Sequence, residues 1–412
     1  MKKSESFFKG SLGFAIIALT LLAAAVTGLY FGVALGRNAL REGDISDESE
    51  LLFDLSEPVS EVPEKLTSAS DGSAAAFAES FASAAESEPE TSASRAEGTE
   101  IEHGWVINSH GYTYLYNGRG YRQFNYGSAA LGRYVDTLAA FCREVSGSSR
   151  VFNLPAPVST TFADIPREIY KEDNFYNLPQ ITFVAAVSTE LGADAVTIDI
   201  VDRLESLYDA GESVYYNTDS NWTPLAAYHA YEAFCNAAGI KSLSVSEFGN
   251  CGYGGFLGDF YKATGSALLA ENEDDFYCLT PPKGITTELN AYVSGKKRSG
   301  YSLCANRYSK DDPFGVYFGI KASRYEIISN AEGGGSLLVI GDTSCRPMIP
   351  LLTAHYSRID YIDPATFQEN LIEFAAKRNY DDILISMYTV NAVSGAEVPA
   401  FANLIGSKDN GQ

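Results

Sequence analysis

The stretch GGGSLLVIGDTS, residues 333–344, decides the fold class of this chain. Its three glycines favour a turn, and the apolar run over 336–340 is short enough to be a central strand that is buried on both faces. Polar residues follow this strand at once, beginning with Asp342. In open α/β sheets, ligands bind in the crevice beyond the carboxyl ends of the strands. Residues 341–344 are therefore the first place where we expect chemistry.

Strands and helices are predicted to alternate on both sides of this stretch. Other short β-rich runs occur at 149–154, 195–200, 358–362 and 383–387. Segments with the length and apolar spacing of crossover helices lie between them, at about 125–145, 179–192, 203–210, 224–238, 346–356 and 366–378. This alternation predicts a layered α/β domain with a central, largely parallel sheet.

The amino-terminal part of the chain has the composition of a membrane anchor. No residue from 10 to 36 is charged, and an apolar run of this length can cross a hydrocarbon core about 30 Å thick. Basic residues precede the run and acidic residues follow it, which places the N-terminus (1–10) in the cytoplasm and the domain outside. A cleaved signal peptide is the alternative, because the alanines at 23–25 offer a cleavage site. Both interpretations predict export, and the span length favours an uncleaved transmembrane helix over residues 11–35.

A segment rich in Ser, Ala and Glu follows the predicted anchor, over residues 36–100. Its many acidic residues repel one another, so we predict a disordered, extended stalk. A folded domain is expected over 101–405 and a short tail over 406–412. The whole chain has 30 Lys and Arg against 53 Asp and Glu, a formal net charge of -23. Such a charge repels a phosphate backbone, which excludes nucleic-acid binding.

All six cysteines lie in the predicted domain. Outside the cell, disulfides are permitted, but buried free thiols are an equal alternative on the sequence alone. The cysteines show no CxxC or Cys/His spacing, so we expect neither a metal ion nor another cofactor.

A second candidate region is the stretch YYNTDSNWTP, residues 215–224. Thr223 is predicted to cap a helix that begins at Pro224, and Gly239 suits the end of that helix. Asp219 and Trp222 then lie at a strand-to-helix junction, where polar groups can point into a crevice. The alternative is that Asp219 only caps a turn and Trp222 only packs in the core.

Together with Ile362-Asp363, the stretches over 215–223 and 337–343 resemble the DHHW family, which is related to the SGNH-hydrolase-like domains of alginate O-acetyltransferase proteins. The likeness runs from about 101 to 400. It implies an SGNH-hydrolase-like layered α/β domain. It also implies a Ser-His-Asp triad that moves or removes an acetyl group on a cell-surface polysaccharide.

Two positions of the implied triad depart from the family pattern. Asp219 and Trp222 are retained, but Asn221 occupies the histidine position and Thr343 the serine position. An amide cannot take the proton of a hydroxyl as an imidazole does, and losing triad members removes about 10⁴- to 10⁶-fold of the rate. We therefore predict a degenerate triad at Asp219, Asn221 and Thr343. The residues predicted to bind a ligand beside it are Trp222, Asp342 and Ser344.

The histidines of the chain offer no evident replacement for the missing base. The four are His103, His110, His229 and His355. His229 lies eight residues past Asn221 on the predicted helix, about 12 Å along its axis, and His355 is similarly remote from Thr343. The other two lie in a Tyr/Gly-rich stretch that predicts a hairpin. Each is expected to be structural. Ser344 follows Thr343 at a helix start, where one residue turns a side chain by about 100°, so it should point elsewhere.

Three functions fit these observations. The first is a membrane-anchored extracellular protein that binds cell-surface polysaccharide or assists its O-acetylation, with a membrane-bound acyl-transfer protein as a candidate partner. The second is an active O-acetyltransferase or esterase that uses Thr343 with an unrecognised base. The third is a structural surface protein.

Overall fold

The structure is a computed structural model that describes residues 103–108, 111–304 and 308–406. The predicted anchor over 11–35, the predicted stalk over 36–100 and nearly all of the predicted tail lie outside these residues. Within the described part of the chain, no helix has both the length and the apolar character that a membrane crossing requires.

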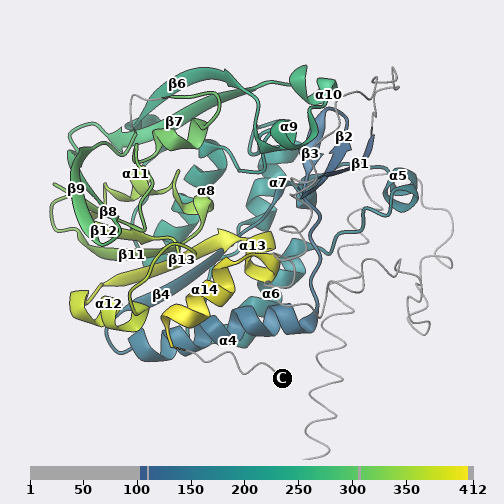
Figure 1. The fold of residues 1–412 in the computed structure, drawn as a ribbon. Helices are drawn as coiled ribbons and strands as arrows, with labels where there is room; N and C mark the ends of the chain where they lie inside the picture. Colours follow the sequence, from purple (N-terminus) through teal and green to yellow (C-terminus); the bar gives the residue numbers. More distant parts are fainter. Residues whose placement is uncertain (1–102, 109–110, 305–307, 407–412) are drawn as a thin grey trace, which may run out of the picture. The chain divides into compact units, whose positions relative to one another are not determined.

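An eight-stranded sheet forms the centre of the domain, in the order β5-β4-β13-β11-β12-β10-β8-β9 (Figure 1). The strands β5, β4, β13, β11 and β12 run parallel to their neighbours, while β10, β8 and β9 continue the sheet antiparallel. The bounds in this order are Val196–Thr197, Arg150–Ala156, Asp382–Tyr388, Gly335–Gly341, Tyr356–Ile362, Arg324–Ser329, Thr287–Val293 and Lys296–Tyr301. The domain is therefore a mixed α/β fold with a large, mostly parallel sheet.

The predicted central strand is confirmed. Strand β11 lies between β13 and β12, and its four residues 337–340 are all buried. An apolar residue at every position is required because helices cover both faces of the parallel part of the sheet. The strands at 150–156, 356–362 and 382–388 likewise match the predicted β-rich runs to within two residues.

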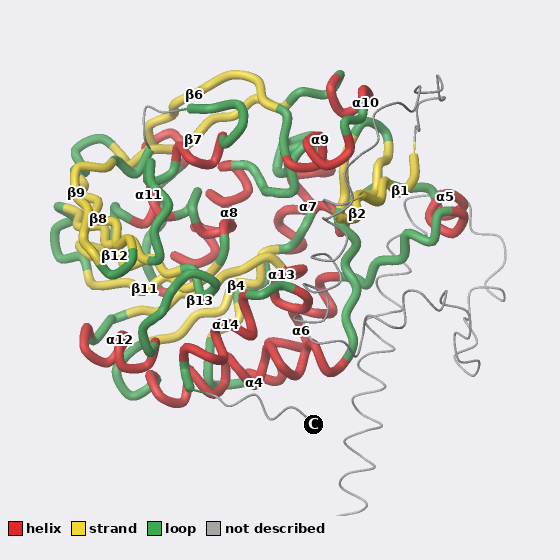
Figure 2. The backbone as a smooth tube through the Cα atoms, in the orientation of Figure 1, coloured by secondary structure: helices red, strands yellow, loops and turns green. Residues whose placement is uncertain are grey.

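Two groups of helices cover the sheet (Figures 1 and 2). Helices α4, α12, α13 and α14 pack together on one face, and α7, α8 and α11 pack on the other, with α6 contacting both α4 and α7. Their bounds are Ser128–Val145 (α4), Gln180–Leu191 (α6), Val201–Asp209 (α7), Pro224–Ala238 (α8), Ile349–Leu352 (α11), Leu371–Arg378 (α12), Thr389–Ser394 (α13) and Glu397–Leu404 (α14). The remaining helices are short: Arg167–Glu172 (α5), Asp259–Thr264 (α9) and Ala267–Ala270 (α10).

Helix α8 begins and ends as its sequence predicts. The Thr223 hydroxyl accepts a bond from the Ala226 amide, Pro224 stands in the first turn, and Gly239 ends the helix in the left-handed conformation. These contacts satisfy amide groups that a helix terminus leaves without partners.

Two smaller sheets flank the central one. Strands β1 (His103–Asn108), β2 (Gly111–Tyr116) and β3 (Arg119–Tyr121) form a meander, which confirms the predicted hairpin. Strands β6 (Phe248–Phe256) and β7 (Asp274–Pro282) form an antiparallel pair. Neither the β6–β7 pair nor the antiparallel side of the central sheet was predicted.

Two predicted elements are much shorter than expected. The run over 195–200 forms only the edge strand β5, Val196–Thr197, because the chain turns into α7 from Val201 on. The predicted helix over 346–356 is reduced to α11, Ile349–Leu352. Pro347 and Pro350 lack the amide hydrogens that a longer helix needs.

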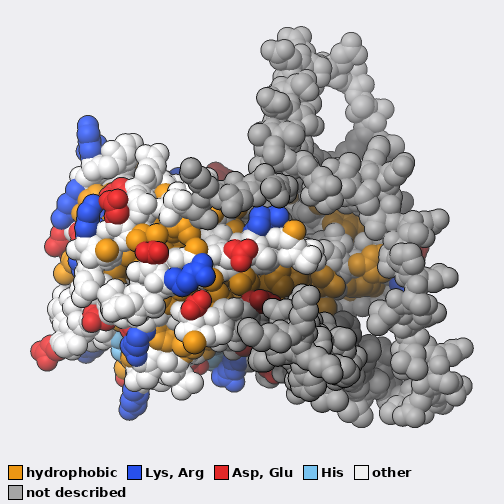
Figure 3. All heavy atoms as spheres, turned by 90° about the horizontal axis from the view of Figure 1, so that it is seen from below, with side chains coloured by type: hydrophobic (Ala, Val, Ile, Leu, Met, Phe, Trp, Pro, Cys, Tyr) orange, Lys and Arg blue, Asp and Glu red, His pale blue; other side chains and the backbone are white. Residues whose placement is uncertain are grey.

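The surface over the α4 face carries charges of both signs scattered among apolar side chains, with no extended patch of one sign in view (Figure 3).

Candidate functional site

The site begins where β11 ends. Gly341 packs so closely against β13 that a Cβ atom there would stand 1.7 Å from the Ser386 carbonyl oxygen. The next residue, Asp342, turns the chain into the 3₁₀ turn Thr343–Cys345 (η4). The Asp342 carboxylate accepts bonds from the Ser344 amide (2.9 Å), the Tyr388 amide (2.8 Å) and the side chain of Asn391 (2.7 Å). This carboxylate therefore holds the turn and fixes the position of Thr343.

The second part of the site is the loop before α8. Its ends meet in an antiparallel bridge between Tyr215 and Trp222. Asp274 on β7 supports the loop from outside, because its carboxylate accepts bonds from the Asn217 amide and from both the amide and the hydroxyl of Thr218, at 2.6–2.7 Å. The loop is thus positioned by a buried carboxylate from another sheet.

These two segments, more than a hundred residues apart in the chain, meet at the predicted triad positions. The Thr343 hydroxyl donates to the Asn221 side-chain oxygen at 3.2 Å. The Asn221 side-chain amide in turn donates to Asp219 Oδ1 at 2.8 Å. The structure therefore brings Asp219, Asn221 and Thr343 into one continuous hydrogen-bonded chain.

Asn221 occupies this chain with the polarity of a neutral histidine. Its Nδ2 donates toward the carboxylate of Asp219 and its Oδ1 accepts from Thr343, as the two ring nitrogens of an imidazole would. The amide oxygen, however, is a very weak base and does not keep a proton. The arrangement therefore links Thr343 to Asp219 by hydrogen bonds, and the amide between them is not a proton acceptor.

Burial and a neighbouring carboxylate change the acidity of Asp219. Desolvation, followed by the nearby charge of Asp259, raises the pKa of Asp219 to about 7, although hydrogen bonds from Asn221 and from the Asp259 amide oppose the shift. Burial also raises the pKa of Asp342 and of Asp363. The site is therefore lined by carboxyl groups that resist ionisation.

The residues predicted to bind a ligand are buried behind the triad positions. Trp222 is 1% exposed, and its ring nitrogen donates to the Ser344 carbonyl oxygen at 3.1 Å. Ser344 is fully buried. Together with Asp342 these side chains join the two segments of the site, and a direct role in ligand binding stays a prediction.

The three described histidines bond to groups away from Thr343. His103 Nδ1 lies 2.7 Å from Asp173 Oδ2, His229 Nδ1 lies 2.6 Å from Glu232 Oε2, and His355 Nε2 lies 2.7 Å from the Tyr231 hydroxyl. Their predicted structural role agrees with these contacts. His110 lies outside the described residues.

Several residues around the site were not recognised from the sequence. Asp259 accepts bonds from the amide (2.7 Å) and hydroxyl (2.6 Å) of Ser220 and lies 3.1 Å from Arg122. Arg346, three residues after Thr343, is half-buried, and its charge lowers the pKa of Asp363, against the larger effect of burial. The sequence could have indicated Arg346, because it lies close to Gly341 and Thr343 in the chain. It could not have indicated Asp259, which reaches the site only through the tertiary fold.

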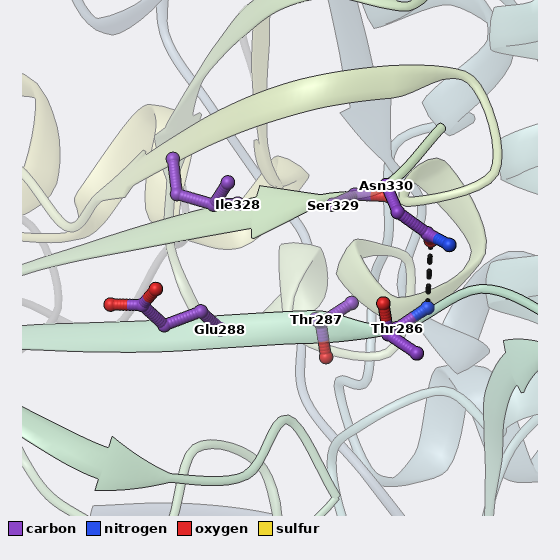
Figure 4. A pocket seen from close by; sticks show the side chains of 6 residues that line it. All are labelled: Thr286, Thr287, Glu288, Ile328, Ser329 and Asn330. Atoms are coloured by element: carbon purple, nitrogen blue, oxygen red, sulfur yellow. Dashed lines mark hydrogen bonds between the residues drawn. The ribbon is translucent and has the colours of Figure 1, made fainter. Parts of the chain in front are cut away.

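A cavity of ≈ 320 Å³ lies elsewhere (Figure 4). Its lining comes from β8, β10 and the adjoining loops: Thr286, Thr287, Glu288, Ile328, Ser329 and Asn330. Ile328 pairs with Arg358 near the start of β12, whereas Thr343 follows the far end of β11. The cavity is thus at the opposite end of the sheet from the site, and the Asn330 side chain is already bonded to the Thr286 amide and the Gly284 carbonyl.

No metal site or disulfide is formed by the residues that the structure describes. No group of three or more His, Cys, Asp and Glu side chains there could hold a metal ion. The six cysteines, all within the described ranges, are free thiols.

The fold and the site define a class: an α/β protein in which Asp219, Asn221 and Thr343 form one hydrogen-bonded chain beyond the carboxyl end of β11. The DHHW protein family model matches residues 18–362, and the chain belongs to this family. No curated protein matches the chain by sequence.

Solved structures show the same fold. A DHHW family protein from Eubacterium siraeum is 20% identical and aligns over 74% of this chain and 98% of that one, with a TM-score of 0.63. Bacillus cereus PatB1, in a structure with a sulfonyl adduct, is 14% identical over 70% of this chain and 97% of that one, with a TM-score of 0.55. The O-acetyltransferase domain of Pseudomonas putida AlgJ is 13% identical, and the alignment covers 74% of this chain and 100% of that one, with a TM-score of 0.42. The shared fold rests on the first two alignments.

Proposed function

We propose that this chain is an exported, membrane-anchored DHHW protein with an SGNH-hydrolase-like fold whose site no longer transfers acyl groups. In this proposal it binds cell-surface polysaccharide, or assists the O-acetylation of that polysaccharide beside a membrane-bound acyl-transfer protein. Residues 11–35 anchor it in the cell membrane, the N-terminus is cytoplasmic, and the domain is extracellular. The composition of residues 1–100 supports this location.

One observation carries the proposed loss of catalysis: the Thr343 hydroxyl donates to the amide oxygen of Asn221, at a distance of 3.2 Å. A hydroxyl attacks an acyl carbon only when a base takes its proton, and Asn221 cannot do so. Thr343 also adds a β-methyl group that restricts its rotamers. The hydrogen-bonded chain is therefore suited to holding a shape and not to moving a proton.

The sharpest test is to restore the missing groups. The double variant Asn221→His, Thr343→Ser should hydrolyse 4-nitrophenyl acetate above background, while the wild-type protein should not. The variant Asn221→His, Thr343→Ala is the matched control, because it has the base without a hydroxyl. A wild-type protein that already turns over this ester, and loses the activity in Thr343→Ala, would contradict the proposal.

A second readout uses covalent labelling. Bacillus cereus PatB1 has been captured with a sulfonyl adduct, and a sulfonyl fluoride reacts with an activated hydroxyl. We expect phenylmethylsulfonyl fluoride to add no mass to the wild-type protein and one sulfonyl group to the restored double variant. Labelling of wild-type Thr343 would support an active nucleophile instead.

An active O-acetyltransferase or esterase is the second candidate, and the acidity of Asp219 favours it. A carboxyl group with a pKa of about 7 can exchange a proton near neutral pH. It reaches Thr343 only through the Asn221 amide, so this mechanism needs a rearrangement or a bridging water. Acetyl-ester turnover that Asp219→Asn and Thr343→Ala both abolish would establish it.

Binding to polysaccharide is tested separately from catalysis. Isothermal titration of the full-length protein against cell-wall and capsular glycans should give saturable binding, and the melting temperature should rise with glycan concentration. If no glycan produces either effect, the proposed carbohydrate role is wrong, and the third candidate function, a structural surface protein, is favoured. Fractionation and protease digestion of intact cells should place the domain on the outer side of the membrane.

A further inference from the structure

Three thiols gather on the side of the domain where β6 and β7 pair. Cys251 on β6 stands directly opposite Cys278 on β7. Cys304 lies beside them, because its thiol donates to the Leu279 carbonyl oxygen at 3.7 Å and its side chain interacts with that of Cys278. Cysteines from three separate segments thus meet at one place.

The three thiols differ in their access to solvent. Cys251 is exposed, Cys304 is half-buried, and Cys278 is fully buried. The Cys278 sulfur also contacts the Tyr253 hydroxyl at 3.9 Å. A reagent of any size can therefore reach Cys251 directly, but it can reach Cys278 only through a neighbouring thiol.

We propose that Cys278 and Cys304 are a dithiol–disulfide site, and that Cys251 is the entry thiol through which an external disulfide oxidises them. The oxidant is a small disulfide such as oxidised glutathione, or the disulfide of a thiol-exchange protein. This site is separate from the Thr343 site and does not depend on the proposed function.

The reaction is a sequence of three exchanges. The Cys251 thiolate attacks the external disulfide, whose S–S bond breaks and releases one thiol. Cys278 then attacks the Cys251 sulfur and releases the second external thiol. Finally Cys304 attacks the Cys278 sulfur, and Cys251 leaves as a thiol. Two protein thiols have then lost two electrons and two protons, and the external disulfide has become two thiols.

The local chemistry supports this order. The hydrogen bond from Cys304 lowers the pKa of Cys278, which makes its sulfur the better nucleophile for the second exchange. The surroundings raise the pKa of Cys251, first by desolvation and then by Cys278. Because only the thiolate reacts, the first exchange should accelerate as the pH rises.

The bridge would connect parts of the fold that are otherwise only packed together. Cys278 belongs to the two-stranded sheet, while Cys304 follows β9 at the edge of the central sheet. A covalent link between them closes the chain segment that contains β8 and β9. Closing a loop of this kind restricts the unfolded chain, so the oxidised protein should melt at a higher temperature than the reduced one.

The test is oxidation of the full-length protein with oxidised glutathione, followed by digestion without reductant and mass spectrometry. We expect a cross-linked peptide pair that contains Cys278 and Cys304, together with a higher melting temperature. No intramolecular cross-link, or a stable Cys251–Cys278 bridge as the final product, would overturn the assignment.

Variants test separately which cysteines form the final disulfide and which thiol reacts first with the oxidant. Cys251→Ser should still reach the Cys278–Cys304 product, but at least about tenfold more slowly, because the buried thiols are poorly accessible. Cys304→Ser should stop at the mixed disulfide on Cys251 or at its bridge to Cys278. Cys235→Ser, at a buried thiol on α8, is the matched control and should change neither rate nor product. An unchanged rate in Cys251→Ser would overturn the entry role.

Discussion

The two segments that meet at Thr343 are held in place by different forces. The turn after β11 depends on close packing, since Gly341 leaves no room for even a methyl group against the Ser386 carbonyl. The loop before α8 depends on carboxylates, because Asp274 and Asp259 together accept five hydrogen bonds from Asn217, Thr218 and Ser220. One support is steric and the other is electrostatic.

Because of this difference, the two supports respond differently to pH, salt and substitutions. Close packing does not depend on pH or salt, and it fails only when atoms are added or removed. Bonds to buried carboxylates change with protonation, and breaking one leaves a buried polar group without a partner. The contact between Asn221 and Thr343 joins the two segments. Because the loop is held by carboxylates and Gly341 by packing, a change of pH should break this contact through the loop and not through the turn.

The largest effect should come from Gly341→Ala. The new Cβ would stand 1.7 Å from the Ser386 oxygen and 2.7 Å from the Cys345 sulfur. Separating β11 from β13 should cost about 3 kcal/mol in the free energy of unfolding, measured by urea titration. Gly132→Ala in α4 is the matched control: with no atom within 4 Å of its Cβ, it should stabilise the protein by about 0.5–1 kcal/mol. If both variants are equally tolerated, the turn is not held by packing.

The electrostatic support is tested next with Asp274→Ala. Two amides and one hydroxyl lose their acceptor in a buried position, so we expect a loss of about 2 kcal/mol in the free energy of unfolding. Asp275→Ala changes an exposed neighbour on the same strand and should have little effect. A restored double variant that keeps its full activity without Asp274 would show that the loop does not need this carboxylate.

Most of the fold followed from local sequence. The apolar run 336–340 and the capping residues Thr223, Pro224 and Gly239 predicted their elements because the periodicity and the caps act within a few residues. The antiparallel strands β8–β10 and the β6–β7 pair were missed. Their residues alternate weakly, and Gly252, Gly254 and Gly255 interrupt β6; their pairing is decided by contacts between distant segments.

The candidate site was predicted only in part, because some of its residues are marked by local sequence and others reach it through contacts between distant segments. The resemblance to a family located Asp219, Asn221 and Thr343, and the structure places them in contact. The carboxylates that hold the loop come from β7 and α9, and nothing in their own sequence marks Asp274 or Asp259 as supports. Ligand binding at Trp222 stays a prediction, while the structure shows that its buried ring bonds to the Ser344 carbonyl and so joins the two segments.

The pH dependence of stability gives a more diagnostic effect. The pKa of Asp219 in the folded protein is about 7, raised from an ordinary value of 3.8, so between these values the folded state binds more protons than the unfolded state. Stability from this group is full below about pH 4 and is lost as the pH rises toward 7. Asp219→Asn should flatten this part of the profile, measured by urea titration from pH 4 to 8. A wild-type profile that rises over this range would contradict the assignment.

The smallest change links the two supports directly. Trp222→Phe keeps a large ring in the core but removes the bond from the indole nitrogen to the Ser344 carbonyl oxygen, at a cost of about 1 kcal/mol. Trp105→Phe is its match, because Trp105 also donates to a backbone carbonyl, that of Asp173, in a cluster away from the site. Both variants should lose similar stability, but only Trp222→Phe should lower the turnover of the restored double variant. Since the indole bond ties the loop to the turn, an equal loss of turnover in both would mean that general stability, and not this bond, positions the hydroxyl.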